Sequence, residues 1–281
     1  MTIKEFKTFF TSELQTIYPL NEIDTFFFYL LEEYLNFQRI DYVLQSDFEI
    51  LEEKKLLFTN ALIRLKQEEP IQYILGKTEF YGLPFNVNKH TLIPRPETEE
   101  LVEWIIQEAQ KTTVSSILDI GTGTGCIPIS LGKNLPHATI YAIDVSEEAL
   151  KVAKENALLN ATKINFLQLD ILSLEILPQK YDIIVSNPPY VRNLEKLEIK
   201  NNVLQNEPHL ALFVDDNNPL VFYDKIADLA KKHLNDDGLL FFEINQYLGK
   251  EMIDLLKNKN FSSVELRKDL FGNDRMIKAK I

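Results

Sequence analysis

Four consecutive residues, Asn187-Pro188-Pro189-Tyr190, combine groups that could orient a planar amine. The Asn187 carboxamide can both donate and accept hydrogen bonds. The two prolines fix their backbone φ angles and remove two N–H donors, so the Pro188 carbonyl is held on a rigid rim. A planar NH2 group could donate to the Asn187 side chain and to this carbonyl, while Tyr190 covers its flat face. We therefore predict that Asn187, Pro188 and Tyr190 are catalytic, and that Pro189 completes a binding wall for an amide or exocyclic amine nitrogen.

A glycine-rich loop, Gly121-Thr122-Gly123-Thr124-Gly125, follows a short apolar segment and precedes a helical pattern. Glycines at such a place allow a tight turn and let a ligand approach the backbone closely. A dinucleotide fingerprint needs Gly or Ala at position 126, and a P-loop needs Gly-Lys at 126–127, but the sequence has Cys126-Ile127. The spacing instead favours S-adenosylmethionine, which has no phosphate to hold.

Two acidic residues follow the next two predicted strands. Asp144 ends the second strand, where a carboxylate can accept hydrogen bonds from ribose hydroxyls. Asp170 and Ile171 follow the third strand, where an adenine could be recognised, although Asp170 could also only cap the next segment. The predicted cofactor-binding residues are therefore Gly121, Thr122, Gly123, Thr124, Gly125, Asp144, Asp170, Ile171 and Asn187.

These groups suggest methyl transfer to nitrogen. An amide or exocyclic amine nitrogen is a poor nucleophile because its lone pair is delocalised. Two fixed acceptors can turn that lone pair toward a sulfonium methyl, so orientation in a closed site would supply most of the rate gain. No dedicated general base is evident in the sequence. None is required before the transfer, because the nitrogen becomes acidic only once it carries the methyl group.

Strand and helix patterns alternate after residue 115 and would position these groups. The predicted strands are 116–120, 139–143, 164–169, 181–186, 239–244, 263–266 and 276–279, and the predicted helices are 125–133, 147–159, 220–234 and 248–257. Helices of this length between strands imply a mostly parallel sheet covered on both faces. The last two strands follow each other closely and should be antiparallel. Ligands bind beyond the carboxyl ends of parallel strands, so the glycine loop and Asn187 should face each other.

The chain before this region has a different pattern. Apolar and aromatic residues recur at helical spacing, which predicts a small helical bundle whose stripes form its core; they are Phe6, Phe9, Phe10, Leu14, Ile17, Phe26, Phe27, Leu30, Leu31, Tyr34, Leu35, Leu56, Leu57, Ala61, Leu62 and Leu65. Residues 78–88 read as a β-hairpin. We expect a helical domain over 1–76, a hairpin or linker over 77–93 and a methyltransferase domain over 94–281, with a helix opening at Glu97 or Thr98.

Composition excludes several classes of protein. The 30 Lys and Arg against 42 Asp and Glu give a net charge of -12, and residues 1–93 and 94–281 are both acidic. Binding a phosphate backbone over a broad surface needs clustered positive charge, so no nucleic-acid partner is expected. The single cysteine allows no internal disulfide, and the four histidines show no metal-ligand spacing, so no metal is expected. No secretory or membrane-spanning segment is evident, which predicts a cytoplasmic protein.

The motifs as a set resemble those of the release factor glutamine N5-methyltransferases, called PrmC or HemK. The resemblance rests on Glu69–Gly76, Leu92–Glu99, Asp119–Gly125 and Ser186–Tyr190, with further likeness at Glu207-Pro208, Ala211-Leu212, Gly238–Leu240 and Glu243-Ile244. It covers nearly the whole chain, and the Pro94–Thr98 segment beside a helical N-terminal region is its most specific part. The sequence departs from the family pattern at Ile171, where an aromatic residue is common, and at Asp215–Asn218, where a Gly-Gly-like turn is expected.

The resemblance implies a seven-stranded class I methyltransferase fold. It also implies that S-adenosylmethionine donates a methyl group to the glutamine in the Gly-Gly-Gln loop of bacterial class I release factors, and that the N-terminal bundle helps to hold the factor. Two alternatives stay open at this point. One is methylation of a ribosomal-protein glutamine, and the other is methylation of an adenine or guanine amino group, since enzymes of that kind also use an Asn/Asp-Pro-Pro-Tyr/Phe motif.

Overall fold

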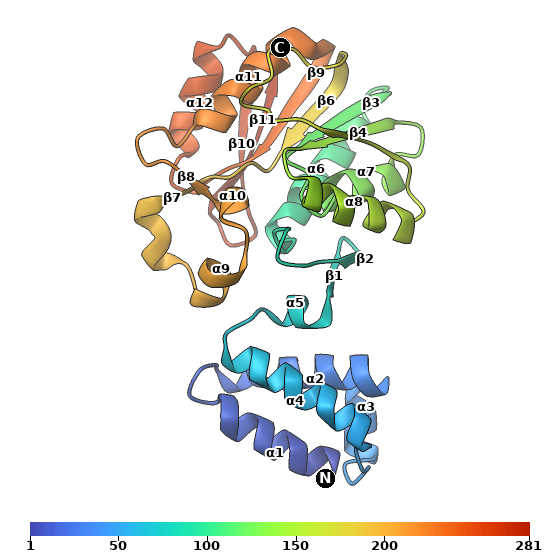
Figure 1. The fold of residues 1–281 in the computed structure, drawn as a ribbon. Coiled ribbons are helices and arrows are strands. Elements are labelled where there is room, and N and C mark those ends of the chain that lie inside the picture. Colours follow the sequence, from blue (N-terminus) through green and yellow to red (C-terminus); the bar gives the residue numbers. More distant parts are fainter. The chain divides into compact units, whose positions relative to one another are not determined.

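The computed structural model describes residues 1–281 and divides into two compact units (Figure 1). The first unit comprises Met1–Gly76 together with Asn201–Asn206, and the second comprises Lys77–Lys200 and Glu207–Ile281. Residues 77–93, expected to form a hairpin or linker, fall within the second unit. None of the helices is long and apolar enough to span a membrane.

The first unit is a bundle of helices with its own apolar core. Its helices are α1 (Ile3–Leu14), α2 (Leu20–Leu35), α3 (Arg39–Leu44), α4 (Glu52–Lys66), α5 (Ile71–Leu75) and α9 (Asn201–Asn206). Phe6, Phe10 and Leu14 recur every fourth residue on α1 and are fully buried, as the spacing predicts. The predicted core included too many residues, however, because four of them are exposed: Phe9, Ile17, Leu56 and Leu57.

A β-hairpin and a helix open the second unit. Strands β1 (Lys77–Phe80) and β2 (Leu83–Asn86) pair antiparallel, and Phe80 and Phe85 are buried in the same cluster as Trp104. Helix α6 (Pro96–Ala109) begins one residue before the earliest expected position. The reason is that Pro96 occupies the first helical position, where a missing N–H costs nothing.

A seven-stranded sheet forms the centre of the second unit, which confirms the predicted fold class. Its strands are β3 (Ser116–Ile120), β4 (Thr139–Asp144), β5 (Ile164–Gln168), β6 (Tyr181–Ser186), β9 (Leu234–Glu243), β10 (Ser263–Lys268) and β11 (Asp274–Lys280). The order across the sheet is β10-β11-β9-β6-β3-β4-β5. Five neighbouring strands are parallel, and β11 runs antiparallel to both of its neighbours. Because the chain leaves β3 for β4 on one side and returns to β6 on the other, a crevice opens at the carboxyl end of β3.

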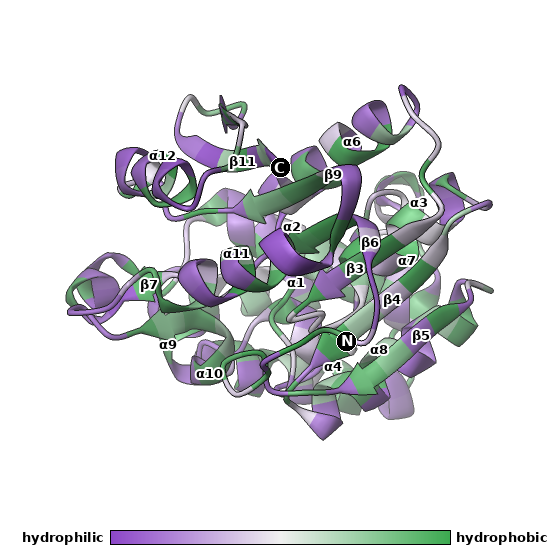
Figure 2. Cartoon of the chain, turned by 90° about the horizontal axis from the view of Figure 1, so that it is seen from above, coloured by the Kyte–Doolittle hydropathy of each residue, from purple (hydrophilic) through white to green (hydrophobic).

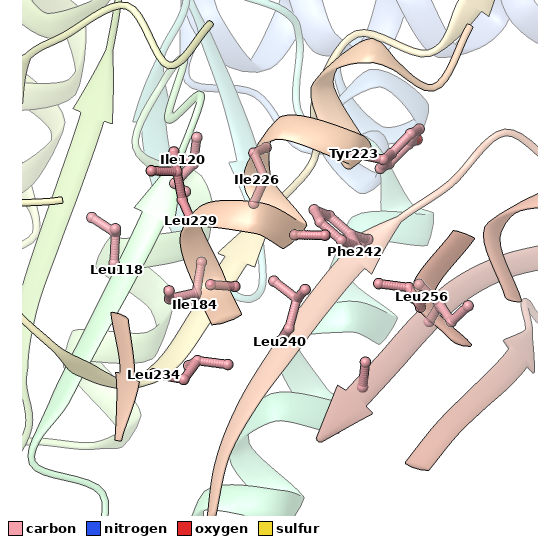
Figure 3. Close-up of a cluster of buried hydrophobic side chains, with 14 of the residues drawn as sticks. Leu118, Ile120, Ile184, Tyr223, Ile226, Leu229, Leu234, Leu240, Phe242 and Leu256 are labelled. Carbon is pink, nitrogen blue, oxygen red and sulfur yellow. The ribbon is translucent and has the colours of Figure 1, made fainter. Parts of the chain in front are cut away.

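Helices cover both faces of this sheet. They are α7 (Cys126–Asn134), α8 (Glu147–Leu159), α11 (Val221–His233) and α12 (Gly249–Asn258), in addition to α6. One buried cluster packs α11 and α12 against alternate strand residues such as Leu118, Ile184 and Leu240 (Figure 3). The intervening strand residues face α6 and α7 in a second cluster. Apolar residues therefore make up most of β3 and β6 and the second half of β9, and green segments run through the sheet in Figure 2.

Short elements between β6 and α11 were not predicted from the sequence. They are β7 (Val191–Arg192), a 3-10 helix (Asn193–Glu198), α9, α10 (His209–Leu212) and β8 (Phe213–Val214), with β7 and β8 pairing in parallel. At the departure from the family pattern, a turn still forms. The Asp215 side chain accepts the backbone N–H of Asn217 at 2.8 Å, and its carbonyl accepts that of Asn218 at 3.1 Å.

Candidate active site and family

A pocket of about 430 Å³ lies at the carboxyl ends of the parallel strands of the second unit. Its lining includes ten of the twelve predicted site residues: Gly121, Thr122, Gly123, Thr124, Asp144, Asp170, Ile171, Asn187, Pro188 and Pro189.

 The other two, Gly125 and Tyr190, do not line the pocket. All the lining residues belong to the second unit. The loops after β3, β4, β5 and β6 thus meet around one cavity.

The glycine loop is held in place by its own backbone and by β4. Gly121, Gly123 and Gly125 all have positive φ angles, at 78°, 54° and 81°. Residues other than glycine rarely adopt this conformation. The N–H groups of Gly121 and Thr122 donate to the Ile143 carbonyl at 2.9 and 3.1 Å. A Cβ on Gly121 or Gly123 would meet no atom within 4 Å, whereas one on Gly125 would lie 3.0 Å from Ile129 Cδ1. Gly121 and Gly123 therefore shape the loop beside the pocket, and Gly125 allows the loop to pack against the helices.

Asp144 links the loop to the second strand. Its Oδ2 accepts the N–H of Gly123 at 2.8 Å, and its Oδ1 accepts the N–H of Ser146 at 2.9 Å. Burial raises the pKa of Asp144, and the backbone donors around it oppose that shift. Each carboxylate oxygen keeps a lone pair, so both can also accept hydrogen bonds from a ligand's hydroxyls.

Asp170 and Ile171 lie together at the end of β5. Asp170 Oδ1 accepts the N–H of Leu172 at 3.0 Å, so its side chain does cap the following turn, and it also lines the pocket. Ile171 is buried and contributes an apolar surface to the same wall. Together they offer an exposed carboxylate beside an apolar face, which suits an adenine edge and plane.

The donor set fits S-adenosylmethionine. Sequence reasoning missed Asp119, the fully buried residue two positions before the glycine loop, whose carboxylate oxygens have no hydrogen-bond partner. Burial raises the pKa of Asp119 to about 7. A buried carboxylate without a partner is costly unless a positive charge compensates it. A cationic nucleoside with ribose hydroxyls for Asp144 would provide that charge close to the loop.

The predicted catalytic segment begins beside the glycine loop. The Ser186 hydroxyl donates to the Ile120 carbonyl at 2.7 Å, which ties the end of β6 to the start of the glycine loop. Asn187 is partly buried, and its Nδ2 donates to the Thr98 hydroxyl oxygen at 3.3 Å. Asn187, Pro188 and Pro189 all line the pocket. The geometry therefore leaves the Asn187 Oδ1 available as an acceptor.

Tyr190 does not line the pocket, and its contacts lie with Glu243 and Asn245. Its hydroxyl donates to Glu243 Oε1 at 3.0 Å, and its carbonyl accepts the Asn245 side-chain amide at 2.9 Å. Burial and the adjacent Glu243 carboxylate raise the pKa of Tyr190, so the hydroxyl stays protonated and acts as a donor. The structure thus shows Tyr190 in contact with the buried Glu243, and the predicted contact of its ring with a substrate stays a prediction.

The segment before α6 contributes residues that had no assigned role. Arg95 Nη2 lies 2.6 Å from Glu207 Oε1, and Glu207 Oε2 accepts the N–H of Ile93 at 3.2 Å. Arg95 and Pro208 line the pocket, so this ion pair between a partly exposed Arg95 and a buried Glu207 connects the segment before α6 to the segment before α10 at the pocket. Glu97 does not line it. The Glu207-Pro208 motif was visible in the sequence, but nothing in the spacing indicated that Arg95 would be its partner.

The remaining titratable candidates have no evident chemical role. Cys126 is buried at the start of α7, and burial raises the pKa of its thiol to about 12. A thiol with so high a pKa is a poor nucleophile at neutral pH. No group of three or more His, Cys, Asp or Glu side chains is placed to hold a metal ion.

Comparison with known proteins identifies relatives of both units. The methyltransferase small domain family matches residues 98–211, and the PrmC N-terminal domain family matches residues 9–76. The chain is 56% identical over 281 residues to the release factor glutamine methyltransferase of Flavobacterium psychrophilum, with 99% of each chain covered. It is 44% identical over 267 residues to the enzyme of that name from Bacteroides thetaiotaomicron, with 95% of each chain covered.

A more distant likeness concerns the fold alone. The crystal structure of the hMettl16 catalytic domain in complex with MAT2A 3'UTR hairpin 6 has a TM-score of 0.56 at 16% sequence identity, and 81% of each chain is covered. This shared fold and the high identity to the two bacterial enzymes agree with the resemblance seen in the motifs. The chain belongs to the release factor glutamine methyltransferase family.

Proposed function

We propose that this protein transfers the methyl group of S-adenosylmethionine to the side-chain amide nitrogen, N5, of the glutamine in the Gly-Gly-Gln loop of bacterial class I release factors. The observation that carries the proposal is the position of Asn187 and Pro188 in the same pocket as the glycine loop and Asp144. The identity to relatives named release factor glutamine methyltransferase supports the choice of substrate. The cytoplasm, where translation ends, is then the site of action.

The residues of the pocket have separable tasks in this reaction. S-adenosylmethionine supplies an activated methyl group on a positively charged sulfur. The glycine loop, Asp144, Asp170 and Ile171 hold the nucleoside, while the buried Asp119 favours a cation nearby. Asn187 Oδ1 and the Pro188 carbonyl accept the two N–H groups of the glutamine amide and so fix the direction of its nitrogen. Orientation of a weak nucleophile in a closed pocket is the main source of rate in this scheme.

The first unit is proposed to hold the release factor. It matches the PrmC N-terminal domain family and has its own apolar core. None of the residues 1–76 lines the pocket. A separate unit of this kind can bind the body of a protein substrate while the second unit receives one side chain. The acidic total charge of -12 makes a nucleic-acid substrate a poor alternative.

A labelling experiment tests the proposal. The enzyme is incubated with methyl-labelled S-adenosylmethionine and either a purified class I release factor or the same factor with its loop glutamine changed to alanine. We expect label on the first protein and none on the second. Ribosomal protein and RNA are supplied in parallel reactions. Equal labelling of both factors, or labelling of only the ribosomal protein or the RNA, would contradict the proposal.

A further inference from the structure

A chain of hydrogen bonds runs from Asn187 through Thr98, which also lines the pocket, to Glu243, which does not. Asn187 Nδ2 donates to Thr98 Oγ1 at 3.3 Å, and the Thr98 hydroxyl donates to Glu243 Oε2 at 2.6 Å. Thr98 and Glu243 are 2% and 1% exposed. They come from the first turn of α6 and the end of β9, so three separate elements meet at this point.

The number of protons in this chain fixes its direction. An ionised carboxylate only accepts hydrogen bonds, and a threonine hydroxyl has one proton to give. Since the Thr98 proton goes to Glu243, the Thr98 oxygen can only accept from Asn187, and Nδ2 is the only donor of the Asn187 side chain. A rotated carboxamide would instead place its oxygen against the Thr98 oxygen with no proton between them. The Asn187 Oδ1 must therefore point away from Thr98.

Both carboxylate oxygens of Glu243 accept hydrogen bonds, Oε2 from Thr98 and Oε1 from Tyr190 at 3.0 Å. Burial raises the pKa of Glu243, whereas these two hydrogen bonds and the positive charge of Arg275 act to lower it and so favour the ionised form. On the far side, the Tyr223 hydroxyl donates to the Glu243 carbonyl at 3.0 Å and ties the residue to α11.

We propose that Thr98 and Glu243 are positioning residues that orient the Asn187 carboxamide, so that its oxygen rather than its nitrogen faces the substrate. Neither residue touches the reacting atoms in this scheme. The inference rests on the proposed function, because an amide nitrogen that donates two N–H groups needs acceptors on the enzyme. With the carboxamide rotated, Asn187 would present an NH2 group to the NH2 group of the substrate. The substrate nitrogen would then lose one of the two acceptors that orient its lone pair.

Two substitutions of Thr98 separate this role from a packing role. Thr98→Val keeps the shape and removes the hydroxyl, whereas Thr98→Ser keeps the hydroxyl and removes the methyl group. We expect Thr98→Val to lower kcat about 10- to 100-fold, as the loss of one orienting hydrogen bond would. Thr98→Ser should stay close to the wild type in kcat. The KM for S-adenosylmethionine and its affinity by calorimetry should change little in both variants.

A third variant tests the carboxylate itself. Glu243→Gln has the same shape but can donate to Thr98, which reverses the hydroxyl and releases the carboxamide, so kcat should fall as in Thr98→Val. Thermal melting of each variant shows whether it is folded. The proposal is overturned if folded Thr98→Val keeps the wild-type kcat, if Thr98→Ser loses as much as Thr98→Val, or if Glu243→Gln keeps full activity. Failure of the wild-type enzyme to label the loop glutamine would contradict the proposed function instead.

Discussion

At the scale of single residues, the proposed function assigns cofactor binding and substrate orientation to different side chains of one pocket. Asp144 contacts the glycine loop through Gly123, whereas Asn187 contacts Thr98. These two residues share no hydrogen bond. Substitutions at the two sites should therefore affect different steps of the reaction.

Replacing Asp144 tests its assignment to the ribose. Asp144→Ala removes two acceptor oxygens from the cofactor side and should weaken S-adenosylmethionine binding about 10- to 100-fold, since a hydrogen bond to a charged group contributes about 1.5–3 kcal/mol. Calorimetry gives the affinity. The matched variant is Asn187→Ala, which should bind the cofactor nearly as well as the wild type while losing most methylation. Unchanged affinity in Asp144→Ala would remove this residue from the site.

Asp119 predicts a trade-off between stability and cofactor binding. Burial raises its pKa from 3.8 to about 7, so the protonated form is favoured in the folded state. The stabilisation from this group is fully present below its unfolded pKa and is lost as the pH rises through about 7. Without cofactor, the melting temperature of the wild type should thus fall between pH 5 and pH 8 relative to that of Asp119→Asn.

The same substitution should weaken the binding of the cofactor. Asp119→Asn keeps the shape but removes the negative charge, so at pH 8 it should melt at a higher temperature than the wild type without ligand and bind S-adenosylmethionine less tightly. Differential scanning calorimetry and titration calorimetry measure the two effects. If the two proteins melted in parallel across this pH range, the buried carboxylate would not be the group that titrates.

At the scale of elements, the glycine loop is fixed by packing as well as by hydrogen bonds to β4. Gly125→Ala would place a Cβ 3.0 Å from Ile129 Cδ1 and 3.2 Å from Ala153 Cβ, at a φ of 81°. Gly121→Ala has a similar φ but meets no atom within 4 Å. The positive φ costs each variant about 1–2 kcal/mol, and Gly125→Ala should lose more because of the contacts. Urea unfolding without ligand gives the free energy of unfolding of each variant. Equal losses of this free energy would show that Ile129 on α7 and Ala153 on α8 move aside at little cost.

Helices and strands with a regular pattern of apolar residues could be predicted well from the sequence. The sheet strands, the four later helices and the positions of the glycine loop, Asp144 and Asn187 follow from strand and helix periodicity and from the rule that ligands bind at the carboxyl ends of parallel strands. Less regular pieces, such as α9 and α10, have six and four residues and were missed because so short a helix leaves no periodic pattern.

Contacts between distant residues could not be predicted in the same way. Thr98 and Glu243 are 145 positions apart, and Arg95 and Glu207 are 112 apart. A single sequence shows each of these as an ordinary polar residue, because the partner is set by the crossing of α6 over the sheet. Phe9 illustrates the opposite error, since its type suggested the core but its place on α1 exposes it.

At the scale of the whole molecule, the proposed function gives the two units different roles. The second unit contains the complete pocket lining, and the first contains none of it. A chain of residues 77–281 should therefore bind S-adenosylmethionine with an affinity close to that of the full chain. It should lose most methylation of the release factor, because the proposed holding surface is gone. Calorimetry and labelling of the same preparation measure both, and full labelling by the shorter chain would contradict a role for the bundle.

The central claim is that the Asn187 wall orients a glutamine side chain of a release factor. Its most direct test is mass spectrometry of the loop peptide from a release factor that has been treated with the enzyme and S-adenosylmethionine. We predict one added methyl group on the side chain of the Gly-Gly-Gln glutamine with the wild type, and almost none with Asn187→Ala although that variant still binds the cofactor. Methylation at another residue, or equal modification by Asn187→Ala, would contradict the account.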